Sequence, residues 1–89
     1  MKNREYYIQE YESRMDEIYR ELQEQNVDDI DYACTMEFDE TANAEEVVGY
    51  YLADGESSAL KRWLENIEGV DLTEQDKEVT RILTELTGN

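Results

Sequence analysis

The chain has 89 residues, of which 24 are acidic and 8 are basic, so its formal net charge at pH 7 is −16. A chain of this length supports one hydrophobic core, and we expect a single domain over residues 1–89. The excess of acids excludes direct binding to nucleic acid or to an anionic membrane, because both ligands require clustered cations. Periodic apolar residues, with one Trp, one Phe and seven Tyr, favour a folded domain over disorder.

The chain has one cysteine, Cys34, and no histidine. A secreted domain of this size would need several disulfides, so we expect the cytoplasm. The N-terminus is polar, and no segment reaches the length of a membrane span. Cys34 lies in apolar sequence without a neighbouring cation, which indicates a small buried hydrophobe. Without histidine the usual nucleophile triads cannot be assembled, and we do not expect an enzyme.

A first helix is predicted from residue 4 to about residue 25, because apolar residues recur there with 3-4 spacing. The residues with this spacing are Ile8, Tyr11, Met15, Ile18 and Leu22. The pairs Glu10–Arg14 and Asp16–Arg20 have the i,i+4 spacing that stabilises a helix. The spacing also suits a coiled-coil seam over about two heptads, so homodimerisation is the second option after packing inside the domain.

Residues 30–38 have two interpretations. Apolar and polar residues alternate from Ile30 to Phe38, which is typical of a strand with one wet face. Read as a helix, Val27, Ile30, Cys34 and Phe38 share one face instead. No second strand is visible, and a lone strand has no hydrogen-bond partner. The fold class expected is therefore mainly α, with four to five helices, and with one short β-strand near residues 30–38 as the α+β alternative.

Three shorter helices are predicted to follow, with Thr41, Ser57 and Thr73 as their N-caps. They are expected to end at Asp54–Gly55, before Gly69 and before Gly88. The first is expected to turn inward Ala44, Val47, Val48, Tyr51 and Leu52. The inward residues of the other two are expected to be Leu60, Trp63, Leu64 and Ile67, then Val79, Ile82, Leu83 and Leu86.

The acids are concentrated in the middle of the chain. No Lys or Arg lies between Arg20 and Lys61, and twelve acids between these residues supply −12 of the net charge. Such a block repels itself, so its partner is expected to be basic. Tyrosine beside carboxylates suits a surface that holds arginine and lysine. The residues predicted to bind the partner are Asp28, Asp29, Asp31, Glu37, Asp39, Glu40, Glu45, Glu46, Tyr32 and Tyr50.

Metal ions and cofactors are not expected. Asp28 to Asp31 contain a D-x-D element, but no glycine stands at the sharp turn of a twelve-residue calcium loop. The glycines are isolated, which excludes a phosphate-binding loop of the known kinds.

In size and charge placement, the chain resembles the small acidic inhibitors of phages and mobile elements, including anti-CRISPR and anti-restriction proteins, several of which mimic DNA. This resemblance implies a basic nucleic-acid-binding protein as the partner and, for a phage-encoded chain, the cytoplasm of a bacterial host. Carboxylates would form an anionic row about 6.6 Å apart on a strand face or about 5–6 Å apart at i,i+4 on a helix. The alternative function is a small helical adaptor or regulatory subunit that binds through an apolar helix face, with the acids serving solubility.

Overall fold

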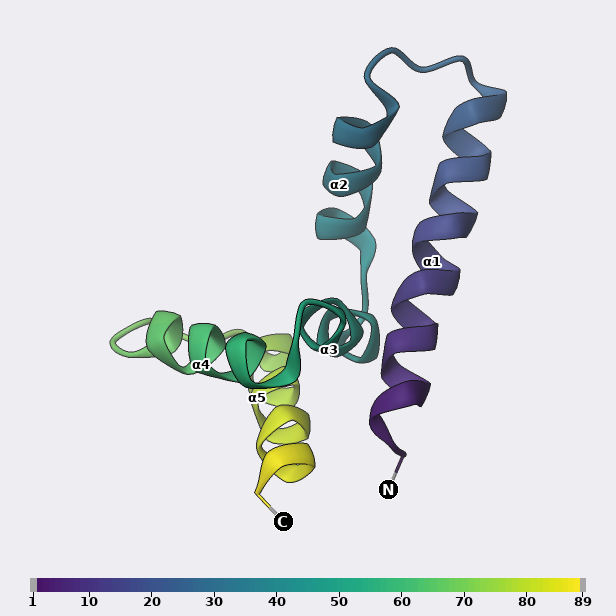
Figure 1. The fold of residues 1–89 in the computed structure, drawn as a ribbon. Helices are drawn as coiled ribbons and strands as arrows, with labels where there is room; N and C mark the ends of the chain where they lie inside the picture. The colour runs from purple at the N-terminus through teal and green to yellow at the C-terminus, as the bar shows by residue number, and fades with distance from the viewer. Residues whose placement is uncertain (1, 89) are drawn as a thin grey trace.

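The computed structural model describes residues 2–88, without the side chains of residues 56, 57 and 59. These residues form five α-helices and no strand, which confirms the prediction of a small, mainly α protein (Figure 1). In chain order the helices are α1 (Arg4–Glu24), α2 (Ile30–Thr41), α3 (Ala44–Ala53), α4 (Glu56–Ile67) and α5 (Glu74–Thr87).

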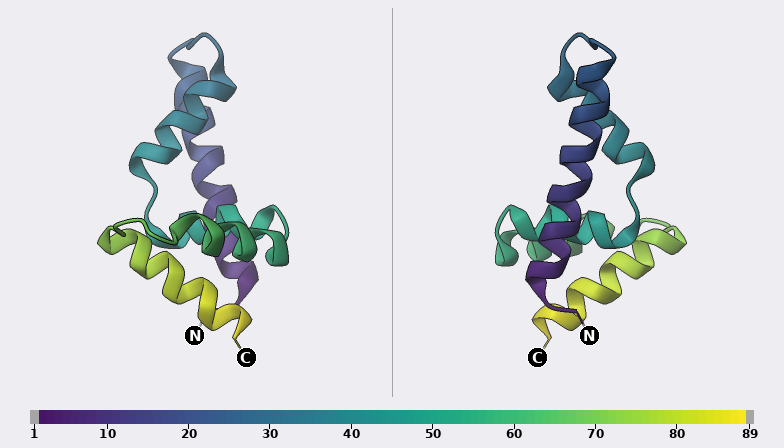
Figure 2. Two further views of the ribbon diagram at one scale, coloured as in Figure 1. Left: turned by 90° about the vertical axis from the view of Figure 1, so that its left-hand side faces the viewer. Right: turned by 90° about the vertical axis from the view of Figure 1, so that its right-hand side faces the viewer.

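Helices α1 and α2 form an antiparallel hairpin that projects from the rest of the molecule (Figures 1 and 2). We call residues 12–42 the arm. The loop between the two helices contains Asn26 and Asp29, whose φ angles of +54° and +50° lie in the left-handed region that asparagine and aspartate tolerate better than most residues. The projection gives the molecule its elongated outline of 44 × 28 × 21 Å.

Residues 30–38 belong to α2, so the strand interpretation was wrong and the helical one is confirmed, except that Val27 lies in the loop before the helix. As a helix, the segment turns Cys34 and Phe38 toward α1, where they are buried with Ile18 and Ala42. Tyr32 and Met36, which a strand would have placed on the same apolar face as Cys34, are instead 55% and 42% exposed. A helix satisfies its backbone hydrogen bonds internally, whereas a strand here would have had no neighbour.

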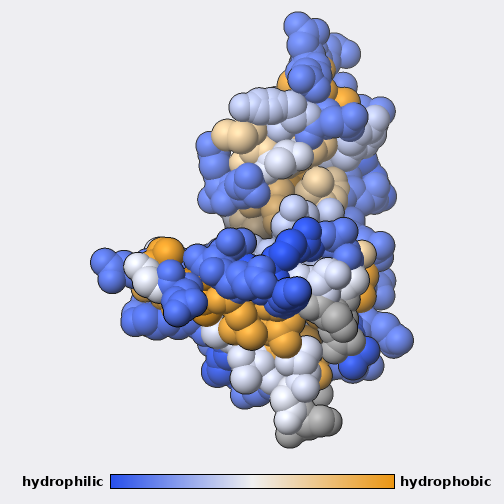
Figure 3. Space-filling model, turned by 60° about the vertical axis from the view of Figure 1, so that its left-hand side comes forward, coloured by the Kyte–Doolittle hydropathy of each residue, from blue (hydrophilic) through white to orange (hydrophobic). Residues whose placement is uncertain are grey.

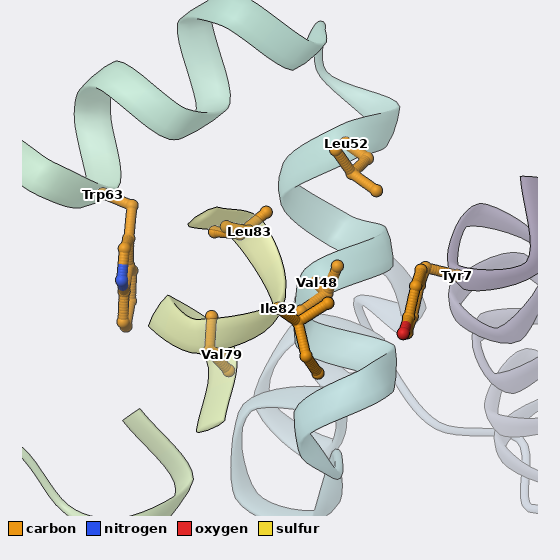
Figure 4. Packing of buried hydrophobic residues seen from close by; sticks show 7 residues of the cluster. All are labelled: Tyr7, Val48, Leu52, Trp63, Val79, Ile82 and Leu83. Carbon is orange, nitrogen blue, oxygen red and sulfur yellow. The ribbon is translucent and has the colours of Figure 1, made fainter. Parts of the chain in front are cut away.

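Helices α3, α4 and α5, together with residues 4–11 of α1, form a second packing unit that we call the base. Figure 4 shows α3 between α1 on one side and the pair α4 and α5 on the other. The buried residues of its core are Tyr7, Val48, Leu52, Trp63, Val79, Ile82 and Leu83. The indole Nε1 of Trp63 donates a hydrogen bond to Thr80 Oγ1 at 2.6 Å, which joins α4 to α5.

Gly49 allows α3 to approach α1 closely. A Cβ atom at this position would lie 2.0 Å from the carbonyl oxygen of Tyr7 and 2.7 Å from Cβ of Tyr11. Both distances are shorter than non-bonded atoms adopt, so any larger residue would force the two helices apart. The contact packs α3 against the part of α1 that belongs to the base, and α1 continues from there into the arm.

Two of the three predicted N-caps are corrected. Thr41 is the last residue of α2, and its hydroxyl donates to the carbonyl oxygen of Glu37. The N-cap of α3 is Asn43, because Glu46 stands three residues after it and completes a capping box. Ser57 lies inside α4, which begins at Glu56 directly after the tight turn at Gly55.

The third predicted N-cap is confirmed, since Thr73 forms a capping box with Asp76 at the start of α5. The predicted inward residues are also confirmed for α3 and α5, which contribute them to the core of the base. In α4 the prediction fails for Leu64, whose side chain is 46% exposed. Figure 3 shows apolar residues gathered over the α4 and α5 part of one face, bordered by hydrophilic residues.

The ion pairs predicted within α1 are half confirmed. Arg20 pairs with Asp16 as expected. Arg14 pairs with Glu17 at 3.2 Å rather than with Glu10. Its second guanidinium nitrogen donates to Thr41 Oγ1 at 2.9 Å, which ties the middle of α1 to the end of α2. The tertiary bond explains the change, because Arg14 must lean toward α2 to make it.

Candidate functional site

The eight predicted binding acids fall into two groups that differ in their contacts. Six of them lie in the arm, where they are exposed to solvent: Asp28, Asp29, Asp31, Glu37, Asp39 and Glu40. Within residues 2–88, none of these six carboxylates forms a hydrogen bond or an ion pair inside the molecule. Asp29 is even the N-cap residue of α2, yet its side chain makes no capping bond. These carboxylates can therefore bind another molecule without breaking an internal contact.

The other two predicted acids, Glu45 and Glu46, are occupied by contacts inside the protein. Glu45 accepts hydrogen bonds from Lys2 Nζ and from the Tyr6 hydroxyl, each at 2.9 Å. The bond from Lys2, followed by that from Tyr6, lowers the pKa of the Glu45 carboxyl. Glu46 accepts the backbone N–H of Asn43 at 3.0 Å in the capping box. Both residues hold the start of α3 in place, which makes them weaker candidates for partner binding than the six arm carboxylates.

The six arm carboxylates do not form the regular row that the sequence suggested. In α2 no two acids have i,i+4 spacing. Asp31 and Glu40 lie on opposite sides of the helix, because nine residues turn an α-helix through about two and a half turns. The strand spacing that would have aligned Asp31, Glu37 and Asp39 is lost in the helix. The charge therefore surrounds α2 instead of forming one line.

An open groove of about 500 Å³ lies between α1 and α2. It collects acids from both helices, since Glu12 and Asp16 of α1 and Asp31 of α2 line it. Its other lining residues are Tyr11, Met15, Tyr19, Cys34 and Thr35. Sequence reasoning missed Glu12, Asp16 and Tyr19 because it looked only within the base-free block. The signal was present in their spacing, which places all three on one side of α1.

The two tyrosines predicted to bind the partner are both exposed, Tyr32 by 55% and Tyr50 by 50%. This confirms that some tyrosines lie at the surface. The ring of Tyr50 lies 5.6 Å from that of Tyr11 and 6.1 Å from that of Phe38, measured between ring centroids. Tyr50 therefore adjoins the groove through Tyr11, whereas Tyr32 of α2 is not among the residues that line it. Tyr7, by contrast, is buried in the core of the base.

The acids near the end of α2 are placed against the helix dipole. The C-terminal end of a helix carries partial negative charge, so an acid there costs about 0.3–1 kcal/mol at low ionic strength. Asp39 and Glu40 lie in the last turn of α2, and no basic residue lies in the last turn of any helix in the described chain. These acids therefore do not serve the stability of the helix that carries them.

Cys34 is a free, buried thiol, as the sequence predicted. Burial, with a smaller contribution from the charge of Asp31, raises the pKa of the thiol. A raised pKa keeps the thiol protonated at neutral pH, in which form it is a poor nucleophile. Cys34 therefore acts as part of the arm's packing and not as a reactive group.

No family model matches the sequence, and no curated protein and no solved structure matches the chain. None of the helices formed by residues 2–88 combines the length and apolarity that a membrane crossing requires. Across the same residues, no three or more acidic or cysteine side chains are grouped so that they could hold a metal ion. A functional assignment therefore has to come from the chemistry of the chain's own surface.

Proposed function

We propose that the protein is an acidic inhibitor that occupies the basic nucleic-acid-binding surface of a target enzyme or complex, in the manner of DNA-mimicking anti-CRISPR and anti-restriction proteins. The observation that carries this proposal is the set of six arm carboxylates without internal partners, in a stretch from residue 21 to residue 60 that contains no base. Arginine and lysine from a partner would satisfy these carboxylates. A basic surface is consequently the complementary partner.

The charge density of the hairpin supports mimicry of a nucleic-acid strand. Residues 4–41 contain thirteen acids and three bases, a net charge of −10. The 21 residues of α1 span roughly 32 Å at 1.5 Å per residue. One strand of DNA carries about nine phosphates over that length, at 3.4 Å per charge. A surface adapted to one strand would therefore meet a similar charge over a similar distance.

A competition assay tests the proposal on a panel of CRISPR effector complexes and restriction enzymes, each loaded with a fluorescent oligonucleotide. The protein is expected to displace the oligonucleotide from its target, and the displacement should weaken steeply as salt rises through physiological strength. A variant carrying Asp29→Asn, Glu37→Gln and Asp39→Asn should be about tenfold weaker, since each exposed pair contributes up to about 1 kcal/mol.

The matched control carries Glu65→Gln, Glu68→Gln and Asp71→Asn, which remove the same charge from α4 and the segment after it. It should compete about as well as the unmodified protein, because these residues lie outside the arm. Equal displacement by both variants, without dependence on salt, would reject mimicry.

Exposed apolar side chains favour a second candidate function, docking of a partner or a second copy through an apolar helix face. Tyr32 and Met36 are i,i+4 neighbours on α2, and Leu64 and Val70 in the α4 region are 46% and 58% exposed. Association of this kind should hardly change with salt, because burial of apolar surface does not depend on screened charge. Sedimentation at low and high salt separates it from mimicry.

A further inference from the structure

We infer that the groove between α1 and α2 binds one arginine side chain of the basic partner. This inference rests on the proposed function and adds the recognition element that the charged surface lacks. An acidic surface alone attracts any cation, whereas a groove with a defined floor and defined walls selects the shape of the side chain that enters it.

The floor of the groove is apolar. It is formed by Tyr11 and Met15, which are half-buried, and by Cys34, which is buried. The methylene stem of a long cationic side chain is apolar up to its charged end, and it gains by lying on such a floor. The volume of about 500 Å³ falls in the range of ligand-binding pockets, and the groove is open to solvent along its length.

The walls of the groove carry the charges that the end of the side chain requires. Glu12 stands on the α1 side and Asp31 on the α2 side, and neither carboxylate has a partner within residues 2–88. Asp16 pairs with Arg20, but both members of that pair are exposed, so the contact is weak and can be exchanged. Within the arm's own structure, Asp16 thus already accepts a guanidinium group at the edge of the groove.

Two features select arginine over a compact cation. The three carboxylates do not converge on one point, since no group of three acids among the described residues could hold a metal ion. A guanidinium group is planar and presents donors in several directions, so it suits carboxylates that do not share one point better than a compact cation does. It also stacks on aromatic rings, and Tyr19, which is 38% exposed, offers a ring at the groove.

Two of the wall carboxylates act on groups that line the groove. Burial is the main cause that raises the pKa of the Tyr11 hydroxyl, with smaller contributions from Tyr50 and Glu12. Burial also raises the pKa of the Cys34 thiol, with a smaller contribution from Asp31.

The test is an NMR titration of the intact protein with the capped tripeptide acetyl-Gly-Arg-Gly-amide, with the corresponding lysine tripeptide for comparison. The arginine peptide should shift the resonances of Tyr11, Tyr19 and the Met15 methyl group, and it should bind several-fold more tightly than the lysine peptide. The double variant Glu12→Gln and Asp31→Asn should bind it at least fivefold more weakly. Unchanged circular dichroism shows that the double variant is folded.

The control is Glu21→Gln with Glu24→Gln, which removes two charges from exposed positions of the arm outside the groove and should change the affinity for the peptide by less than twofold. Equal losses in both double variants would overturn the inference, because they would show general attraction and no site. Absence of shifts at Tyr11 and Tyr19 would overturn it as well. The proposed function fails separately, if the protein does not displace oligonucleotides while the peptide still binds in the groove.

Discussion

The arm and the base are stabilised in different ways. The base has seven buried residues in its core, contributed by four helices, and its helices α3 and α5 begin with capping boxes. It also contains ion pairs in which a Lys or Arg neutralises an acid, such as Arg62 with Asp54 and Arg81 with Glu78 and Glu85. The base therefore contains both the larger apolar core and the ion pairs that neutralise its acids.

The arm lacks most of these devices. Its core consists of four buried residues, Ile18, Cys34, Phe38 and Ala42. The N-cap of α2 makes no side-chain bond, and no base follows Arg20 within the arm. Stability and exposed negative charge are therefore separated along the chain. The base contributes most of the stability. The arm contains carboxylates at the negative end of the α2 dipole, and it stays folded because α1 connects it to the base.

The largest expected effects come from removing one core side chain in each region. Leu83 of the base is fully buried and Ile18 of the arm is 1% exposed. Truncation of either residue to alanine leaves a cavity that costs about 2–5 kcal/mol. In hydrogen exchange measured by mass spectrometry, Ile18→Ala should expose α2 while α5 stays protected, whereas Leu83→Ala should weaken protection throughout.

The outcome for Ile18→Ala decides whether the two regions are separate units of stability. If α2 and α5 lose protection together and to the same extent, the chain unfolds as one cooperative unit. The arm and the base would then form one unit of stability, and they would differ only in their charge.

An intermediate effect is expected from the charges at helix ends. Asp39→Asn with Glu40→Gln removes two acids from the negative end of α2, and the protein should gain about 1 kcal/mol of stability, or several degrees in Tm. The control is Glu5→Gln with Glu74→Gln, which removes two acids from the first turns of α1 and α5. This control should lose stability, because acids are favourable at those ends.

The dependence of Tm on salt shows whether charge causes these changes in stability. Added NaCl should raise the Tm of the unmodified protein by screening the repulsion among its acids, and it should diminish the gain of the arm variant. Thermal melts in low salt and in about 1 M NaCl measure both effects. A gain that persists unchanged in high salt would show that the substitutions act through packing or local structure and not through charge.

The sequence allowed most of the helices to be predicted, but it left residues 30–38 ambiguous for a physical reason. Cys34 and Phe38 share a face in a helix, while Cys34 and Met36 share one in a strand, and both patterns fit the apolar residues. Only the position of α1 decides between them, because Ile18 provides the surface that buries Cys34 and Phe38. The N-cap Thr73 was predicted correctly, whereas Asn43 was missed because Thr41, two residues earlier, was predicted as the N-cap of α3.

The candidate site was predicted in part. The base-free stretch was visible in the sequence, but it did not show which acids are occupied. Glu45 is bonded to Lys2, 43 residues earlier in the chain, a contact that depends on how α3 packs against α1. The groove depends in the same way on the hairpin, which places Asp31 of α2 in the lining of the same groove as Glu12 and Asp16 of α1. Local spacing identifies faces of helices, and packing decides which faces meet.

The smallest expected effect concerns the contact of Lys2 with Glu45, which belongs to the base. The hydrogen bond from Lys2 is the main cause that lowers the pKa of Glu45 below its ordinary value of 4.5. Because the folded state binds this proton less readily than the unfolded state, the contact stabilises the protein above about pH 4.5 and is lost as the pH falls through the lower, folded value. The same bond raises the pKa of Lys2 above 10.5, so the stabilisation is also lost at strongly alkaline pH.

Glu45→Gln should therefore lower the Tm more at about pH 5 than at about pH 3, where the contact contributes less because Glu45 takes up its proton. Lys2→Met should show the same difference between the two pH values, and the double variant should add little to either single change, as expected for two residues that act through one contact. Since Lys2 and Glu45 are partly exposed, the change in Tm should be smaller than that caused by Asp39→Asn with Glu40→Gln. Additive effects of the two single variants would show that Lys2 and Glu45 act independently in solution, and the attachment of α3 to the start of α1 would then depend on the Tyr6 hydroxyl, Gly49 and the apolar core.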